Sequence, residues 1–223
     1  VYRSFSNFDS YTGVFSVNRE FNMLDDEDLG TFNSTFVPSV TAFRVFLQGE
    51  ELLRSHRAEI DWKTTLRDQG SFGLNVYLDE RDFIGSLDKT GAILGVGLSR
   101  SIVFPKSGIF LSYKTNFEHF YANSDVQTYI KRSFDVSTRQ GINSSTFAST
   151  SINYSEKDYE ASDPLLGLRT DKGLSLRFGL TKVLNLCWNA DMGVTFSNNK
   201  SSIGLYERSN EGLAVKFNYL CTE

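Results

Sequence analysis

The feature that most constrains this chain is an alternation of apolar and polar residues with a period of two, which recurs from one end to the other. The clearest case places Trp188, Ala190, Met192, Val194 and Phe196 against Asn189, Asp191, Gly193 and Thr195. Successive side chains of a β-strand point to opposite faces, so this pattern predicts strands with one apolar and one polar face. The same split recurs at residues 72–79, 92–99, 109–118, 174–181 and 213–219.

Turn-forming residues separate these runs at regular intervals. Examples are Asp68-Gln69-Gly70, Pro105-Lys106-Ser107-Gly108 and Ser209-Asn210-Glu211-Gly212. The runs predict about 12 strands, or roughly 18 to 19 residues for each strand with its connection, which is more than the 8 to 12 typical of sandwiches. Strands of about ten residues with an attached turn or loop are typical of a membrane barrel.

The composition agrees with strands and excludes several other classes. The chain has 19 Phe, 10 Tyr and 17 Gly but only 2 Met and 3 Pro, a balance that favours strands joined by turns. The longest apolar run, residues 92–98, is far shorter than a membrane-spanning helix. A net charge of −4 lacks the basic footprint of a nucleic-acid partner. Cys187 and Cys221 are isolated and no phosphate-binding glycine motif occurs, so we expect neither a metal nor a cofactor.

Periodicity alone does not separate a soluble β-sandwich from a barrel in lipid, because both leave the same alternation. Three features favour the barrel: polar faces rich in small residues, charges of both signs on those faces, and aromatic residues near the strand ends. The charged residues expected to line the lumen are Glu59, Asp61, Lys63, Arg67, Asp79, Lys114, Glu118, Lys131, Asp135, Arg177, Asp191 and Lys216. The aromatic residues expected at the membrane interface are Trp62, Phe117, Tyr154, Trp188 and Tyr219.

Because the signs of the inner charges are interleaved, we expect cross-strand pairing, for example among Asp61, Lys63, Lys114 and Glu118. Paired charges can close a narrow lumen as readily as they select a solute. The sequence therefore leaves two interpretations open, a salt-bridged interior and a conducting pore.

Four segments fit the pattern less well. Residues 50–68 can be drawn as an amphipathic helix or a strand, and we prefer the strand because all its charges then share one face. Residues 35–47 are apolar on both faces and contain Pro38, which predicts a bulge or an edge-like start. Arg132 falls on an apolar face, where a position near a rim would be the least costly. Residues 25–28 and 156–171 are predicted to be polar loops.

Two segments in the last third of the chain resemble a known family. Asp163-Pro164-Leu165-Leu166-Gly167-Leu168-Arg169-Thr170-Asp171 is similar to a loop that opens a strand in certain bacterial outer-membrane barrels. Asn199-Lys200-Ser201-Ser202-Ile203-Gly204-Leu205-Tyr206 resembles a hairpin in the barrel of the surface lipoprotein assembly modifier family and related barrels linked to tetratricopeptide repeats. The resemblance implies a Gram-negative outer membrane, surrounding lipid, a periplasmic or surface protein partner, delivery of lipoproteins or polysaccharide to the surface, and a preceding repeat domain.

The sequence thus predicts an all-β, antiparallel up-and-down transmembrane β-barrel of about 12 strands, forming one domain over residues 1–223. The expected function is a porin-like channel or translocation protein for a polymer, a lipoprotein or a solute, and the chain is expected not to be an enzyme. One alternative is a phospholipase-like lipid-modifying enzyme, with His119 acting on a nearby serine such as Ser124. An interfacial histidine without a catalytic role is the simpler interpretation of His119, and a soluble β-sandwich binding module is the other alternative.

Overall fold

The alternating segments form twelve β-strands in the computed structural model, which describes residues 10–24, 32–47, 50–66, 70–185 and 188–219. The strands are β1 (Ser10–Asn18), β2 (Phe21–Leu24), β3 (Phe32–Leu47), β4 (Glu50–Leu66), β5 (Gly70–Phe83), β6 (Gly91–Phe104), β7 (Ile109–Ala122), β8 (Tyr129–Asn143), β9 (Thr146–Tyr159), β10 (Thr170–Val183), β11 (Trp188–Ser201) and β12 (Arg208–Tyr219). Single 3₁₀ turns, η2 (Leu87–Lys89), η3 (Asp125–Gln127) and η4 (Gly204–Tyr206), interrupt three connections. Within the described ranges, no helix is long and apolar enough to cross a membrane.

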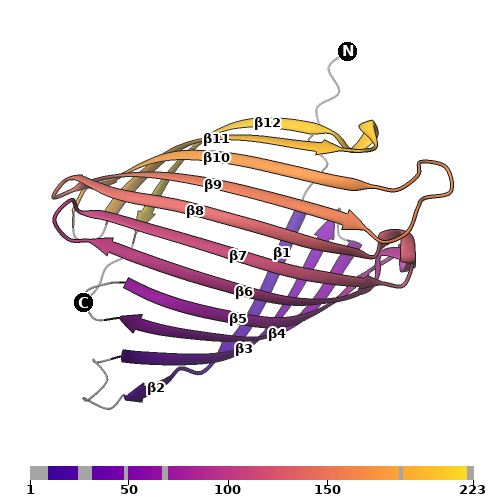
Figure 1. The fold of residues 1–223 in the computed structure, drawn as a ribbon, viewed down its shortest axis with the longest axis horizontal. Helices are drawn as coiled ribbons and strands as arrows, with labels where there is room; N and C mark the ends of the chain where they lie inside the picture. Colours follow the sequence, from indigo (N-terminus) through magenta and orange to yellow (C-terminus); the bar gives the residue numbers. More distant parts are fainter. Residues whose placement is uncertain (1–9, 25–31, 48–49, 67–69, 186–187, 220–223) are drawn as a thin grey trace.

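The strands form one antiparallel sheet in which neighbours in sequence are neighbours in space. The hydrogen-bonded order runs β1-β3-β4-β5-β6-β7-β8-β9-β10-β11-β12, and β2 also pairs with β3. Figure 1 shows this sheet curled on itself, with the N-terminal strands crossing behind the strands at the front. The prediction of an all-β, antiparallel up-and-down barrel of about 12 strands is confirmed.

The first two strands are halves of one interrupted strand. Asn18 lies opposite Ser39 and Phe21 lies opposite Phe36, so β1 and β2 keep the same register against β3. The interruption at residues 19–20 faces Pro38, which has no N–H to donate to a neighbour. The predicted irregularity in residues 35–47 therefore has two parts, this interruption and a register shift at Val45/Phe46 opposite β4.

One of the uncertain segments is a strand over most of its length, and another is a strand only at its two ends. Residues 50–66 form β4, which confirms the preference for a strand over a helix. The predicted loop at 156–171 was drawn too long, because β9 continues to Tyr159 and β10 begins at Thr170. Side chains still point to alternate faces through Glu156–Tyr159, but three successive charged residues there leave no alternation of apolar and polar types in the sequence. The acidic residues 25–28 and Arg67 lie outside the described residues.

The connections at the two ends of the barrel differ in length. At one end, four connections (84–90, 123–128, 160–169 and 202–207) have six to ten residues, and we call this the long-loop end. At the other, the short-turn end, four connections (67–69, 105–108, 144–145 and 184–187) have two to four residues. The chain between β3 and β4, which joins them at the long-loop end, and that between β2 and β3, at the short-turn end, are exceptions in length.

Burial separates the two faces of the sheet. On β5 and β6, the inward Tyr77 and Ile93 are only 7% and 2% exposed, whereas the adjacent outward Leu78 and Leu94 are 47% and 50% exposed. Tyr77 and Ile93 pack with Phe120 in a small aromatic cluster on the inner face. Burial of Tyr77 depends on its register partner Gly95, because a Cβ at Gly95 would overlap the Tyr77 ring.

We predict that Gly95→Ala lowers the free energy of unfolding by about 1–3 kcal/mol, because the added methyl forces Tyr77 out of its position. Urea titration of the detergent-folded barrel, followed by heat-modifiable gel mobility, would measure this change. Gly212→Ala is the matched control, since a Cβ at Gly212 has no neighbour within 4 Å. If Gly95→Ala were as stable as the control, the close packing of Tyr77 over Gly95 would be disproved.

Candidate functional site

One register row of inward-facing residues crosses eight strands on the long-loop half of the barrel. We call it the inner row, and it comprises Glu59, Tyr77, Gly95, Glu118, Lys131, Lys157, Asp171 and Ser201. Each residue lies directly opposite the next, because two residues paired across antiparallel strands point their side chains to the same face of the sheet. The sheet thus places acidic, basic and aromatic groups side by side across its concave surface.

The first half of the inner row is a continuous network of contacts. Arg57 forms an ion pair with Glu59 at 2.7 Å and stacks over the ring of Tyr77, with its guanidinium carbon 3.7 Å from the ring centroid. The Tyr77 hydroxyl donates a hydrogen bond to Glu118, and Lys131 forms an ion pair with Glu118 at 3.0 Å. These contacts fix the side chains of four strands in one arrangement.

The second half of the inner row contains a lysine among aromatic rings and a well-bonded aspartate. The Lys157 ammonium lies 4.0 Å from the Tyr129 ring centroid and 5.8 Å from that of Tyr159. Asp171 accepts hydrogen bonds from both the Nε and Nη2 of Arg169, at 3.0 and 2.6 Å, and from the Ser201 hydroxyl at 2.6 Å. The Asp171 carboxylate therefore has hydrogen-bond donors within the protein, whereas the Lys157 ammonium is stabilised by the ring faces of Tyr129 and Tyr159.

Arg169 belongs to the connection between β9 and β10, whose conformation is fixed locally. The Asp163 carboxylate accepts hydrogen bonds from the backbone N–H groups of Leu165 and Leu166, at 2.8 and 3.0 Å, and Gly167 adopts a positive φ of 84°. Arg169 then stacks over Tyr206 with its guanidinium carbon 3.5 Å from the ring centroid. Burial opposes the charge of Arg169, but the hydrogen bonds to Asp171 outweigh it and raise the pKa of the guanidinium.

A polar cavity of about 410 Å³ opens beside this half of the inner row, and we call it the long-loop cavity. Its lining comprises Lys131, Ser155, Lys157, Arg169, Asp171, Asn199, Leu205, Tyr206, Glu207 and Arg208. Five of these residues come from the two segments that carry the family resemblance in the sequence, namely Arg169, Asp171, Asn199, Leu205 and Tyr206. Sequence reasoning missed Lys157 and Asp171 because it assigned them to a loop.

A second cavity of about 410 Å³, lined by polar and apolar groups, lies on the short-turn half along β3 to β7, and we call it the short-turn cavity. Asp61, Lys63, Asn75 and Lys114 contribute polar groups to it. Gly73 and Gly97 also line it and add no side-chain volume. Small residues on the inner face therefore leave polar space here.

The charged residues predicted to line the lumen lie on the inner face wherever they are described. Their acidic members are satisfied by nearby donors: Asp79 by Ser55 and Arg81, Asp61 by Asn75, Asp135 by Asn153, and Asp191 by Thr181. Lys216 lies opposite Asp191 in the register of β11 and β12. Among the described residues, no ion pair within 4.0 Å involves Lys63, Lys114 or Arg177. Glu118 therefore pairs with Lys131 rather than with Lys114, and the lining of a water-filled lumen stays a prediction.

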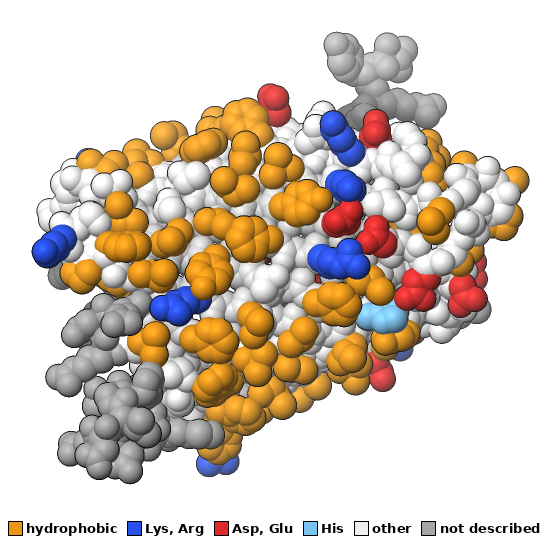
Figure 2. Space-filling model, in the orientation of Figure 1, with side chains coloured by type: hydrophobic (Ala, Val, Ile, Leu, Met, Phe, Trp, Pro, Cys, Tyr) orange, Lys and Arg blue, Asp and Glu red, His pale blue; other side chains and the backbone are white. Residues whose placement is uncertain are grey.

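The outer face is an apolar belt that ends abruptly toward the long-loop end (Figure 2). Phe134, Tyr154 and Leu174 lie side by side at the edge of this belt. Two residues further along these three strands lie Arg132, Glu156 and Lys172, which with Lys200 of β11 form the outer charged row. Along β11, the eight residue steps from Trp188 to Phe196 span about 26 Å at 3.3 Å per residue, or about 20 Å at a 40° tilt. That height approaches the apolar band of an outer-membrane barrel.

The outer charged row explains why Arg132 occupies a position on the otherwise apolar outer face. This residue forms an ion pair with Asp158 at 3.2 Å, and Lys172, on the other side of Glu156 in the row, pairs with Glu156 at 3.0 Å. Arg132 thus lies beyond the apolar belt, toward the long-loop end, where water and polar head groups would meet it. The expected position near a rim agrees with the structure.

The predicted interfacial aromatic residues are distributed over both edges of the belt. Trp62 contacts Phe72 edge-on, with ring centroids 6.0 Å apart, near the short-turn end. Trp188 lies in register with Tyr219 at the same end, although the Tyr219 side chain is outside the described structure. Phe117 lies opposite Arg132, and Tyr154 lies at the belt edge. Their position at a membrane interface stays a prediction.

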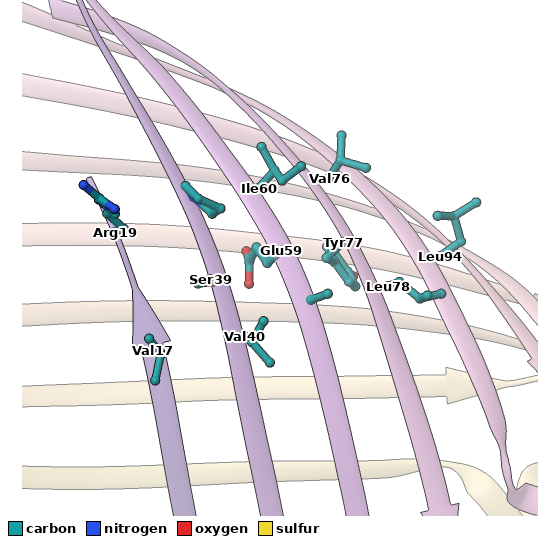
Figure 3. Close-up of a pocket in the computed structure, with 12 residues that line it drawn as sticks. Val17, Arg19, Ser39, Val40, Glu59, Ile60, Val76, Tyr77, Leu78 and Leu94 are labelled. Atoms are coloured by element: carbon teal, nitrogen blue, oxygen red, sulfur yellow. The ribbon is translucent and has the colours of Figure 1, made fainter. Parts of the chain in front are cut away.

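An apolar groove of about 540 Å³ interrupts the outer face over β1 to β6. The small side chain of Ala58 lies among Val40, Ile60, Val76 and Leu78 and leaves this space. Figure 3 shows that neighbouring strands contribute the lining side chains. Irregular spaces of this kind on a lipid-facing surface suit flexible acyl chains.

His119 lies on the outer face near the long-loop end, beside Tyr121 with ring centroids 3.8 Å apart. Its Nε2 contacts the Glu160 carboxylate at 2.7 Å. In the described part of the chain, no hydrogen bond joins His119 to a serine hydroxyl, so the geometry does not favour the phospholipase-like interpretation.

If the outer face contacts lipid, the loss of folding stability caused by a charge on that face must depend on how deep the charge lies in the bilayer. We predict that Val136→Arg, at the centre of β8, destabilises the barrel by about 2–4 kcal/mol in a bilayer. Ile130→Arg, on the same face of the same strand near the long-loop end, is the matched control and should cost about 0–1 kcal/mol. Denaturant titration in phospholipid vesicles measures both, and equal costs would contradict a lipid-facing belt.

Comparison with solved structures supports the barrel. The chain is similar to OmpTdeltaL8, a loop L8 deletion mutant of OmpT, an outer membrane protein of Vibrio cholerae, with a TM-score of 0.52 and 6% sequence identity. The similarity covers 96% of this chain and 99% of that one. No protein-family model matches the sequence, and no curated protein matches it significantly.

These comparisons support the predicted fold but not the predicted family. The fold is that of a bacterial outer-membrane β-barrel. The narrower resemblance to the surface lipoprotein assembly modifier family has no support from a family match. The expectation that the chain is not an enzyme is corrected by the same structural similarity. A barrel fold shared with OmpT at 6% identity gives no ground for excluding catalysis, so that expectation is withdrawn.

Proposed function

We propose that this chain forms a passage for a polar solute across the outer membrane of a Gram-negative bacterium. The observation that carries the proposal is the polar inner face, which holds two cavities of about 410 Å³ each, one lined mainly by polar groups and one by polar and apolar groups, instead of a packed apolar core. An apolar belt on the opposite face supports a lipid surrounding. A polar interior inside an apolar exterior is the arrangement that lets a polar molecule cross a bilayer.

The lengths of the connections support one orientation. Outer-membrane barrels have short periplasmic turns and longer extracellular loops. The long-loop end, with connections such as 160–169, would therefore face the outside, and the short-turn end would face the periplasm. The long-loop cavity then becomes the outer mouth of the passage.

The inner aromatic cluster is the proposed narrow point. On β5, the residues that line the short-turn cavity end at Asn75, and Tyr77 follows on the same face. Tyr77 packs with Ile93 and Phe120, and stacking by Arg57 holds its ring in place. A solute that moves along the inner face of β5 and β6 must pass this cluster.

Delivery of a larger cargo, a polymer or a lipoprotein, together with a periplasmic or surface protein partner, is a further possibility that the sequence resemblance supports. The segments that carry the resemblance surround the long-loop cavity. A cavity of about 410 Å³ suits a small solute better than a folded lipoprotein. We therefore place a small polar solute first.

We predict that Tyr77→Ser raises single-channel conductance severalfold in planar bilayers, because it removes the largest side chain of the cluster. Leu78→Ser is the matched control: it alters the adjacent residue, which faces outward, and should leave conductance unchanged. Phe120→Ala provides a second test of the narrow point if Tyr77→Ser does not fold. A folded barrel that does not conduct in any of these forms would disprove the proposed passage.

A further inference from the structure

The long-loop cavity carries more positive than negative charge. Its lining includes four basic side chains, Lys131, Lys157, Arg169 and Arg208, and two acidic ones, Asp171 and Glu207. Lys131 and Lys157 lie directly opposite each other on β8 and β9, and both face the cavity. Like charges at directly opposed positions destabilise a sheet unless another group compensates them.

Two of the four basic groups are compensated within the protein. Lys131 forms an ion pair with Glu118 at 3.0 Å, and Arg169 binds Asp171 through two hydrogen bonds. Lys157 instead contacts the Tyr129 ring face. Within the described structure, neither Lys157 nor Arg208 has a carboxylate within 4.0 Å, so these two charges remain available to a ligand.

The other lining groups suit a hydroxylated ligand. Ser155 and Asn199 supply a hydroxyl and an amide at the cavity wall, and Tyr206 supplies an aromatic ring with a polar tip. The volume of about 410 Å³ lies in the range of small-molecule sites. A free anion such as phosphate would use the basic groups but would leave the hydroxyl and amide groups unused.

We propose that the long-loop cavity binds an acidic sugar, with Lys157 and Arg208 holding its carboxylate and Ser155 and Asn199 contacting its hydroxyls. The proposal rests on the proposed passage, because it names the class of solute that would enter at the outer mouth. Charge-assisted hydrogen bonds from two cations give such a site its affinity, and the neutral polar groups give it a preference for sugars.

The test is isothermal titration of the full chain, folded in detergent, with D-glucuronate, D-glucose and inorganic phosphate as probes. D-glucuronate should bind, and D-glucose should bind at least tenfold more weakly because it lacks the carboxylate. Phosphate binding as tight as that of D-glucuronate would overturn the assignment to a sugar. Equal binding of glucose and glucuronate would overturn the role of the basic groups.

Variants locate the site. Lys157→Met and Arg208→Gln should each weaken D-glucuronate binding about tenfold or more. Lys172→Met is the control, because Lys172 lies on the outer face and pairs with Glu156. If Lys157→Met does not give a heat-modifiable folded band, the exposed Arg208→Gln carries the test. Unchanged affinity in a folded variant would overturn the proposal.

Conductance measured in parallel separates the two proposals. Binding of D-glucuronate to a barrel that does not conduct would support the acidic-sugar site and disprove the passage. A conducting barrel that shows neither binding nor block by D-glucuronate would overturn the site and leave the passage in place. If both proposals hold, D-glucuronate added to the long-loop side should block the current, and Lys157→Met should relieve that block.

Discussion

The antiparallel backbone ladder is the constraint on which the rest of this structure depends. From β3 onward each strand pairs with the next, and β1 and β2 both pair with β3, so register fixes which side chains share a face and which lie directly opposite one another. A slip of one residue would exchange the two faces of a strand. The apolar belt and the polar interior therefore depend on the register, which among the described strands shifts only at Val45/Phe46 and Gly141/Asn143.

The two faces are adapted to opposite surroundings, and this difference also explains the unusual burial. In a soluble protein the apolar residues would pack inward, yet here Leu78 and Leu94 are exposed, while their inward neighbours Tyr77 and Ile93 are buried. The inner face is held together by ion pairs, hydrogen bonds and stacked rings rather than by an apolar core. This packing also restricts the sequence, because the Tyr77 ring occupies the space that a side chain at residue 95 would need, and only glycine fits there.

Much of the fold could be predicted from the sequence because period-two alternation is a local signal. The strand at 50–66 was predicted because its charges were expected to share one face, which holds for residues 57–63 but not for Arg54. The placement of Arg132 near a rim followed from the cost of a charge in lipid. The candidate site could not be predicted as well, because the partner of a side chain depends on register between strands. Lys157 was assigned to a loop because the successive charges at the end of β9 show no apolar and polar alternation. The group expected to form cross-strand pairs with Glu118 did not include Lys131, which is its partner.

Near the long-loop end of β8 to β10, the basic residues of the two faces differ in whether they have an acidic partner, and this difference supports a ligand-binding role for one of them. On the outer face, Arg132 and Lys172 each have an acidic partner, as expected of charges at the edge of an apolar belt. One residue away on the inner face, Lys131 has such a partner and Lys157 does not. At this level of the sheet, the basic groups of Arg132 and Lys172 have partners on the exposed face, where pairing contributes least to stability, and leaving Lys157 without one on the inner face adds no stability to the fold. The unpaired lysine is best explained by a partner that comes from outside the chain.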